Sequence, residues 1–222
     1  MTTTVGIAGG TGALGRGLAA RWAVAGVPVR LGSRDAARGE AAATELNAEL
    51  PADAVAVEGG HLSSLADRDV VVLAVPYESV APTLAALADL PDGRLVVSAL
   101  NPLAFDADGP YAVASDGGES IAEQIAATFP TARVVGAFHT VSSRQLARLD
   151  HPMDEDVPVV SDDEGAMATV VALADRIEGC RGVAVGRLRL AATLEALTPV
   201  LISVNKRHGA HTGIRFSDLD LG

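Results

Sequence analysis

The chain of 222 residues is poor in cysteine, lysine and aromatic side chains, and each shortage excludes something. Its single cysteine, Cys180, cannot form a disulfide within the chain, which fits a reducing cytoplasm. Lys206 is its sole lysine, and 17 basic residues stand against 28 acidic ones, for a formal net charge of −11. Nucleic-acid binding needs clustered Lys and Arg, so we expect no nucleic-acid partner.

Signals for a membrane are missing as well. Residues 1–4 carry no positive charge and precede no apolar stretch of signal length. No apolar run approaches the roughly 20 residues that a membrane span needs, and an acidic surface disfavours anionic membranes. We therefore expect a cytoplasmic protein with no membrane partner.

Small aliphatic residues are abundant, with 49% apolar residues but only 3% aromatic ones. This composition suits a parallel sheet covered by alanine-rich helices. Strand-like and helix-like runs alternate through the first hundred residues, which predicts an α/β fold with a Rossmann-type, doubly wound parallel sheet. The strand-like runs are residues 5–8, 27–31, 54–58, 70–75 and 94–98, and the helix-like runs are residues 13–25, 35–50 and 79–90.

The pattern changes after residue 100. Residues 101–117 contain two prolines with several Asp and Gly, which predicts a loop. Residues 188–206 form the longest helical candidate, although Pro199 should kink or restart the helix. Between them we expect helices at residues 120–129 and 164–177, strands at residues 133–138, 157–161 and 183–185, and an acidic loop at residues 150–156.

A glycine-rich loop follows the first strand directly. Residues 10–15 fit Gly-x-Gly-x-x-Gly and open an amphipathic helix, which is the context that dinucleotide binding requires. In this motif the glycines permit a tight turn, a close approach to the pyrophosphate and close helix–strand packing, while free N–H groups bind the phosphates. We expect the contacts to come from Gly10, Thr11, Gly12, Ala13 and Leu14.

The end of the second strand indicates which dinucleotide binds. An NAD site usually has an acidic residue there, whereas this chain has Ser33 and Arg34, which suit a 2′-phosphate. Arg38 lies one helical turn further and adds positive charge. The sequence therefore predicts NADP(H). Val75, Pro76 and Asn101 follow the fourth and fifth strands and should line the nicotinamide side.

Groups that commonly catalyse carbonyl reduction are absent from the sequence. Neither Tyr77 nor Tyr111 has a lysine four residues later, and one cysteine cannot supply the usual zinc ligands. We expect no metal and no general acid or base from the protein. A hydride acceptor that stabilises its own negative charge, such as a flavin-like ring, would need neither. The protein would then mainly hold two rings at hydride distance.

Several further motifs carry a family resemblance. The chain resembles NADPH-dependent F420 reductases, also called F420H2:NADP oxidoreductases, over nearly its whole length. The motifs are the phosphate loop at residues 9–15, the clamp at residues 32–34, the Pro-aromatic-Glu turn at residues 75–78, His139-Thr140, residues 156–159 followed by Asp162-Asp163, Glu195 with residues 197–199, and residues 213–216.

This resemblance implies a reversible hydride transfer between NADP(H) and the deazaflavin coenzyme F420. It implies an NADP-binding domain at residues 1–140 and a smaller, helical part at residues 141–222 that contributes the deazaflavin site and the contacts of a homodimer. His139 and Thr198 would position the ring, which Thr140, Val141 and Pro199 would also border. Candidates for binding the anionic tail of F420 are Arg187, Arg189, Lys206 and Arg207.

The chain also departs from the family pattern. Ala196 stands where some members have serine, which removes one hydrogen bond to the ring, and residues 217–222 extend past the last motif. Two other functions stay open: an NADPH-dependent ferric or flavin reductase, and a non-catalytic NADP sensor. The pairs His139-Thr140 and Thr198-Pro199 argue against a sensor, because they have no purpose without a second ring.

Overall fold

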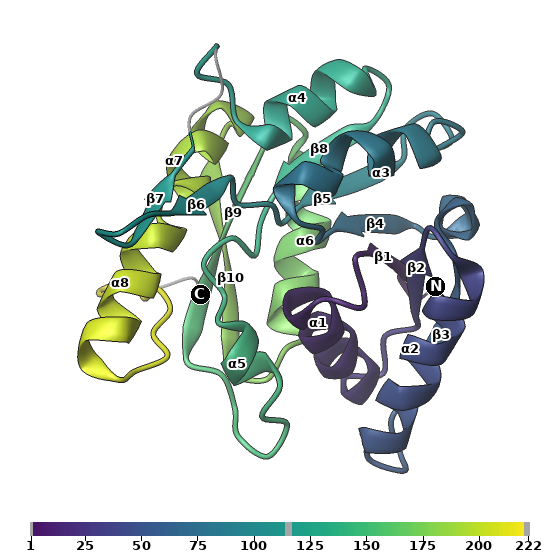
Figure 1. Cartoon of the computed structure of the whole chain (residues 1–222). Helices are drawn as coiled ribbons and strands as arrows, with labels where there is room; N and C mark the ends of the chain where they lie inside the picture. Colours follow the sequence, from purple (N-terminus) through teal and green to yellow (C-terminus); the bar gives the residue numbers. More distant parts are fainter. Residues whose placement is uncertain (1, 114–116, 220–222) are drawn as a thin grey trace.

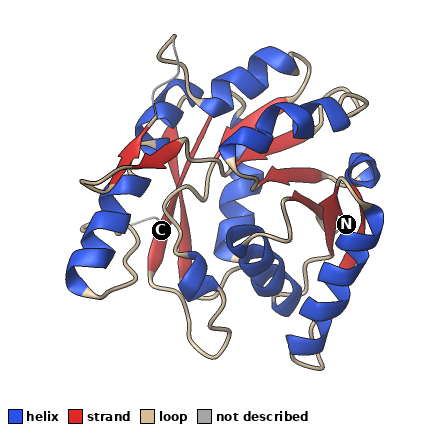
Figure 2. Ribbon diagram, in the orientation of Figure 1, coloured by secondary structure: helices blue, strands red, loops and turns tan. Residues whose placement is uncertain are grey.

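An eight-stranded sheet forms the centre of the molecule (Figures 1 and 2), in a computed structural model that describes residues 2–113 and 117–219. The strand order is β10-β9-β8-β5-β4-β1-β2-β3. Neighbours from β3 to β8 are parallel, which confirms the doubly wound α/β fold, while β9 runs antiparallel to β8. The strands are β1 (Val5–Ala8), β2 (Val29–Ser33), β3 (Glu58–His61), β4 (Val70–Leu73), β5 (Leu95–Ser98), β8 (Arg133–Gly136), β9 (Glu155–Ser161) and β10 (Cys180–Gly186).

Helices cover both faces of this sheet. Side chains of α1 (Ala13–Val24), α2 (Ala36–Glu49) and α6 (Glu164–Asp175) share a core with one face. Those of η1 (Leu62–Asp67), α3 (Val80–Ala86) and α4 (Ile121–Thr128) share a core with the other. Strand β4 is therefore apolar throughout, because Val70 and Val72 belong to the first core and Val71 and Leu73 to the second.

The third strand is not where the sequence predicts it. Residues 54–58 were expected to form it, but β3 begins at Glu58. The side chain of Asn47 explains the shift, because it accepts from the N–H of Val57 and donates to its carbonyl, both at 2.8 Å. Gly59 then lets the strand pass close to Gly39 of α2, where a Cβ atom would collide with the helix backbone. Two consecutive glycines give little strand signal, so the pattern was misread.

The predicted loop at residues 101–117 is also wrong in part. It contains a small antiparallel hairpin, β6 (Leu103–Phe105) and β7 (Pro110–Ala112), which contacts the C-terminal helix. The long helical candidate is divided into η3 (Leu188–Leu190), α7 (Ala191–Glu195) and α8 (Thr198–His208). Pro199 lies in the first turn of α8, which confirms that it restarts the helix. The short elements η2 (Tyr77–Ser79) and α5 (Ser143–Leu146) complete the described fold.

One expectation about membranes needs correction. The stretch Leu188–His208 has 21 residues and contains an apolar window with a mean hydropathy of 1.2, so by length and composition alone it could cross a membrane. In the structure it is split into η3, α7 and α8, and 28% of its apolar window is buried in the protein.

A buried arginine of helix α1 binds the segment that follows β8. The buried guanidinium of Arg21 donates to the carbonyls of Gln145, Leu146, Arg148 and His151 at 2.6–3.0 Å. These bonds hold α5 against α1, near the carboxyl ends of the parallel strands. Ligands of open α/β sheets bind at this edge.

Candidate active site

The glycines of the phosphate loop differ in how closely other atoms approach them. A Cβ atom at Gly15 would lie 2.6 Å from the carbonyl oxygen of Gly9, and one at Gly10 would lie 2.5 Å from Leu31. At Gly12 the nearest atom would be 3.3 Å away, and this residue is exposed. Gly12 is also the N-cap of α1 without a side-chain cap, so N–H groups at this helix start remain available for an anion.

A first pocket of about 340 Å³ adjoins this loop. Ser33 is partly buried there, while Arg34 and Arg38 are exposed. Asp35 accepts from the N–H of Ala37 at 2.9 Å, so this carboxylate caps α2. The pocket is lined by Gly9, Thr11, Gly32, Ser33, Arg34, Asp35, Arg38, Leu62, Val75, Pro76, Ser79 and Thr83.

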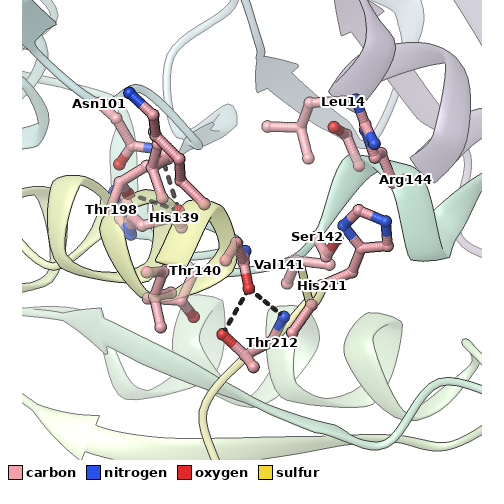
Figure 3. Close-up of a pocket in the computed structure, with 16 residues that line it drawn as sticks. Leu14, Asn101, His139, Thr140, Val141, Ser142, Arg144, Thr198, His211 and Thr212 are labelled. Atoms are coloured by element: carbon pink, nitrogen blue, oxygen red, sulfur yellow. Dashed lines mark hydrogen bonds between the residues drawn. The ribbon is translucent and has the colours of Figure 1, made fainter. Parts of the chain in front are cut away.

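A second pocket, of about 480 Å³, lies on the other side of the loop (Figure 3). Its walls are the segment after β8, one face of α8 and the segment that follows α8. Leu14 lines it from the start of α1, so the glycine loop borders both pockets. The lining residues are Leu14, Asn101, His139, Thr140, Val141, Ser142, Ser143, Arg144, Thr198, Leu201, Ile202, Asn205, Lys206, Ala210, His211 and Thr212.

Two side chains in this pocket hold one carbonyl group. Asn101 Nδ2 and Thr198 Oγ1 each donate to the main-chain oxygen of His139 at 2.9 Å. The backbone turns sharply just before it, since Phe138 has a φ of +65°, which is uncommon for a residue other than glycine. Phe138 packs edge-to-face on Trp22 with ring centroids 5.5 Å apart, which fixes the turn from the core side.

Several buried polar atoms in the same pocket have no partner. His139 is only 4% exposed, and burial lowers the pKa of its imidazole to about 4, so the ring is neutral at pH 7. Among the described residues, neither ring nitrogen has a hydrogen-bond partner, nor do Thr140 Oγ1 and Asn101 Oδ1. Unpartnered buried polar atoms are costly, so their gathering at one pocket indicates a polar ligand.

Glu195 has a structural task that the sequence motif did not reveal. Its buried carboxylate accepts from the N–H groups of Ile121 and Ala122 at 3.0 and 3.2 Å, at the start of α4. Burial raises its pKa to about 7, against the lowering effect of these two bonds. The contact ties α7 to α4 and thereby sets where α8 begins.

The segment after α8 forms one wall of the second pocket. Its Thr212 donates from both N–H and hydroxyl to Asn205 Oδ1, at 2.7 and 2.8 Å. Gly213 passes so close to Glu155 that a Cβ atom would collide with that side chain. Burial raises the pKa of Glu155 to about 7, although the N–H of Ser142 donates to its carboxylate.

The residues that follow Phe216 lie against β10, away from the second pocket. Arg181 donates to the carbonyls of Phe216 and Leu219, at 3.1 and 2.7 Å, and pairs with the buried Asp156 at 2.7 Å. Residues 217–219 are therefore held at β10 and do not cover the second pocket. Residues 220–222 lie outside the described part of the chain.

Most of the predicted site residues line one of the two pockets, and four line neither. Of these four, Pro199 is buried in the first turn of α8, Gly10 is buried beneath its loop, and Gly12 and Ala13 are exposed at the helix start. Asn101 and Leu14 were expected to contact NADP(H) but line the second pocket.

Other lining residues were missed. Leu201, Ile202 and Asn205 follow Thr198 at helical spacing, which was a usable signal. Arg144, His211 and Thr212 belong to irregular or very short segments, and their positions depend on tertiary contacts.

Comparisons with known proteins agree with this arrangement. The profile of the family described as "NADP oxidoreductase coenzyme F420-dependent" matches residues 4–102. The F420-dependent NADP reductase of Methanothermobacter thermautotrophicus is 35% identical over 99% of this chain and 97% of its own length. A solved structure from Arthrobacter, provisionally described as an F420-dependent NADP reductase, is 26% identical with a TM-score of 0.79, covering 97% of this chain and 100% of its own. A pyrroline-5-carboxylate reductase from Coxiella burnetii, 14% identical with a TM-score of 0.57 over 94% of this chain and 72% of its own, shares the fold.

Proposed function

The chain belongs to the family of F420-dependent NADP reductases, and on that premise we propose how its two pockets divide the reaction. The protein is an oxidoreductase that transfers a hydride between NADP(H) and the deazaflavin coenzyme F420. NADP(H) occupies the first pocket and reaches past the glycine loop, and the deazaflavin occupies the second. The observation that carries this assignment is that one loop borders both pockets.

Two features support NADP(H) in the first pocket. Beside it, α1 begins at the exposed Gly12 without a side-chain cap, so N–H groups at this helix start can bind the pyrophosphate. Ser33, Arg34 and Arg38 line the far end, where they can bind a 2′-phosphate. Asp35 also lines this pocket, and its carboxylate accepts from the N–H of Ala37 at the start of α2.

The second pocket fits a flat ring with polar edges. The free capacity of Asn101 Oδ1, Thr140 Oγ1 and the imidazole of His139 matches the carbonyl and N–H groups of a deazaflavin. Leu14, Val141 and Leu201 supply apolar contacts for the ring faces. When both substrates are bound, the nicotinamide C4 supplies a hydride that the deazaflavin C5 accepts.

The protein contributes positioning rather than proton transfer. Asn101 and Thr198 donate to the carbonyl of His139, and these two hydrogen bonds fix the backbone that lines the pocket. The low pKa of His139 keeps its imidazole neutral and removes it as an acid at pH 7. Such a site suits an acceptor ring that delocalises the negative charge it receives.

We further propose the following division of the chain. Residues 1–140 bind NADP(H), and residues 141–222 supply most of the deazaflavin site and the contacts of a homodimer in the cytoplasm. Val200 and Val204 support the dimer contacts, because they are 56% and 38% exposed on α8. The neighbouring hairpin adds Phe105, which is 64% exposed.

Absorbance at 340 nm tests this function. NADPH oxidation should be fast with oxidised F420, and slow when NADH replaces NADPH or when FMN or a ferric chelate replaces F420. Equal or faster turnover with FMN or the chelate would favour a flavin or ferric reductase. NADPH binding without turnover on any acceptor would favour a sensor.

A further inference from the structure

A buried carboxyl group touches two walls of the second pocket without lining the pocket itself. It belongs to Glu155, the first residue of β9, which is only 3% exposed. Its Oε2 atom accepts from the N–H of Ser142, a lining residue of the segment after β8, at 3.3 Å. The same carboxyl group packs on Gly213, where a Cβ atom would lie 2.3 Å from Glu155 Cδ. Gly213 directly follows Thr212, which lines the pocket from the segment after α8 (Figure 3).

The second of these walls has no strand of the sheet beside it. Strand β9 pairs with β8 only through Val160 and Ser161, near its end. At the start of β9, the N–H of Asp156 donates instead to the carbonyl of Ile214 at 2.6 Å. The segment after α8 therefore runs along the start of β9, and its position depends on the side chains there.

The carboxylate of Glu155 has no cation to neutralise it. Within residues 2–113 and 117–219, no basic side chain lies within 4.0 Å of it. The nearest arginines in sequence on β10 and after α8 are occupied, since Arg181 pairs with Asp156 and Arg215 with Asp154, at 2.7 and 2.6 Å. The other titratable or charged groups on the elements around Glu155 are Cys180 on β10, Arg21 on α1, Arg144 on α5 and His211 after α8.

Ionisation of Glu155 should loosen the contact between the two walls. Burial raises its pKa to about 7, against the lowering effect of the Ser142 N–H, and the carboxylate of Asp154 adds to the rise. The neutral form suits this site, whereas the ionised form is a buried charge without a partner cation. Movement of Gly213 away from it would admit water and restore the ordinary pKa of about 4.5. The free energy that holds the walls together should therefore fall between about pH 4.5 and 7 and level off above.

We infer that Glu155 is a positioning residue for the deazaflavin, because its carboxyl group sets the spacing between the segment after β8 and the segment after α8. The inference rests on the proposed function, which places the ring between these segments. Glu155 acts through Ser142 and Thr212, since it does not line the pocket. It also gives the glycine in the motif at residues 213–216 a physical reason, because a side chain at Gly213 would occupy the place of the carboxyl group.

Three variants test this role. Glu155→Gln keeps the size of the side chain and an acceptor for the N–H of Ser142, but it cannot ionise. Glu155→Ala removes the group altogether. Asp154→Asn is the matched control, because it removes an exposed carboxylate that also contacts the segment after α8. Quenching of F420 fluorescence gives Kd for each protein at pH 5.5 and pH 7.5, and NADPH titration reports on the first pocket.

The Kd of wild type divided by that of Glu155→Gln cancels the titration of F420 itself. This ratio should rise at least about 3-fold from pH 5.5 to pH 7.5, and Asp154→Asn should behave like wild type. Glu155→Ala should bind F420 about 5-fold more weakly than Glu155→Gln at both pH values, because Ser142 loses its acceptor. Kd for NADPH should stay within about twofold throughout. A residue with a merely structural role would not give the pH-dependent ratio.

Hydrogen exchange at residues 210–216 tests the wall without any ligand. Relative to Glu155→Gln, exchange in wild type should also rise at least about 3-fold between the two pH values, after correction for intrinsic rates. If F420 binds but the Kd ratio and the exchange ratio stay constant, the inference fails while the proposed function stands. The same holds if Glu155→Ala binds F420 as tightly as Glu155→Gln. If none of the proteins binds F420, the proposed function fails and the inference with it.

Discussion

The hydroxyl of Thr198 donates to the main-chain oxygen of His139 at 2.9 Å, across 59 residues of sequence. This bond joins the first turn of α8 to the turn after β8. Because Asn101 donates to the same oxygen, three segments meet at one atom in the wall of the second pocket. The site therefore depends on the C-terminal helix being placed against the strand ends.

Removal of this hydroxyl should weaken deazaflavin binding selectively. Thr198→Val keeps the shape of the side chain but loses a hydrogen bond worth about 1 kcal/mol, so KM for F420 should rise about 5-fold. KM for NADPH should stay within about twofold. Thr198→Ser retains the donor and is the control. If the valine and serine variants behave alike in steady-state kinetics, the bond has no such role.

Two substitutions in the glycine loop should differ in their effects, one on stability and the other on NADPH binding. Gly15→Ala places a Cβ atom 2.6 Å from a backbone oxygen, so it should lower the melting temperature by several degrees. Gly12→Ala places its Cβ atom 3.3 Å from the carbonyl oxygen of Gly9, a much milder contact, so it should lower the melting temperature less while NADPH binding weakens at least about 10-fold. Thermal unfolding and NADPH titration of both variants test this contrast. Equal melting temperatures for the two variants would contradict it.

Arg34 should determine the preference for NADPH over NADH. A charged hydrogen bond to a 2′-phosphate contributes about 1.5–3 kcal/mol, so Arg34→Ala should raise KM for NADPH by about 10- to 150-fold. KM for NADH should change little. Arg187→Ala, which removes an exposed arginine paired with Asp162, is the control. A proportional rise in both KM values would show that Arg34 acts on the fold instead.

Glu195 should make the protein less stable as pH rises. Its folded pKa is raised to about 7 by burial, so the free energy of unfolding should fall between about pH 4.5 and 7 and level off above. The full effect is on the order of 3 kcal/mol. Glu195→Gln should remove this slope relative to wild type, whatever its constant cost.

Urea unfolding at several pH values measures this difference, with the exposed Glu40→Gln as the control for loss of one charge. The stability of each variant is compared with that of the wild type at every pH. This comparison is needed because Glu155, with a raised pKa, and His139, with a lowered pKa, also make the free energy of unfolding depend on pH. A slope that survives in Glu195→Gln would assign the pH dependence to other groups.

The sequence predicted the parts of this site that local chemistry determines. The phosphate loop, the Ser33-Arg34 turn and His139-Thr140 lie directly after strands, so the doubly wound topology brings them to one edge. What could not be predicted depends on contacts between distant segments. The bond from Asn47 shifts β3, Arg21 places α5, and Asn205 holds Thr212 at the pocket. The antiparallel β9 was missed because strand direction is not encoded in local periodicity.

Transfer of an isotope tests the central claim most directly. NADPH with deuterium at both C4 positions is mixed with excess enzyme and oxidised F420 in light water, and the product is analysed by NMR and mass spectrometry. Direct transfer between rings held in the two pockets predicts one deuterium on C5 of the reduced deazaflavin, which does not exchange there. Hydrogen from solvent at C5, with the deuterium lost to water, would contradict the account.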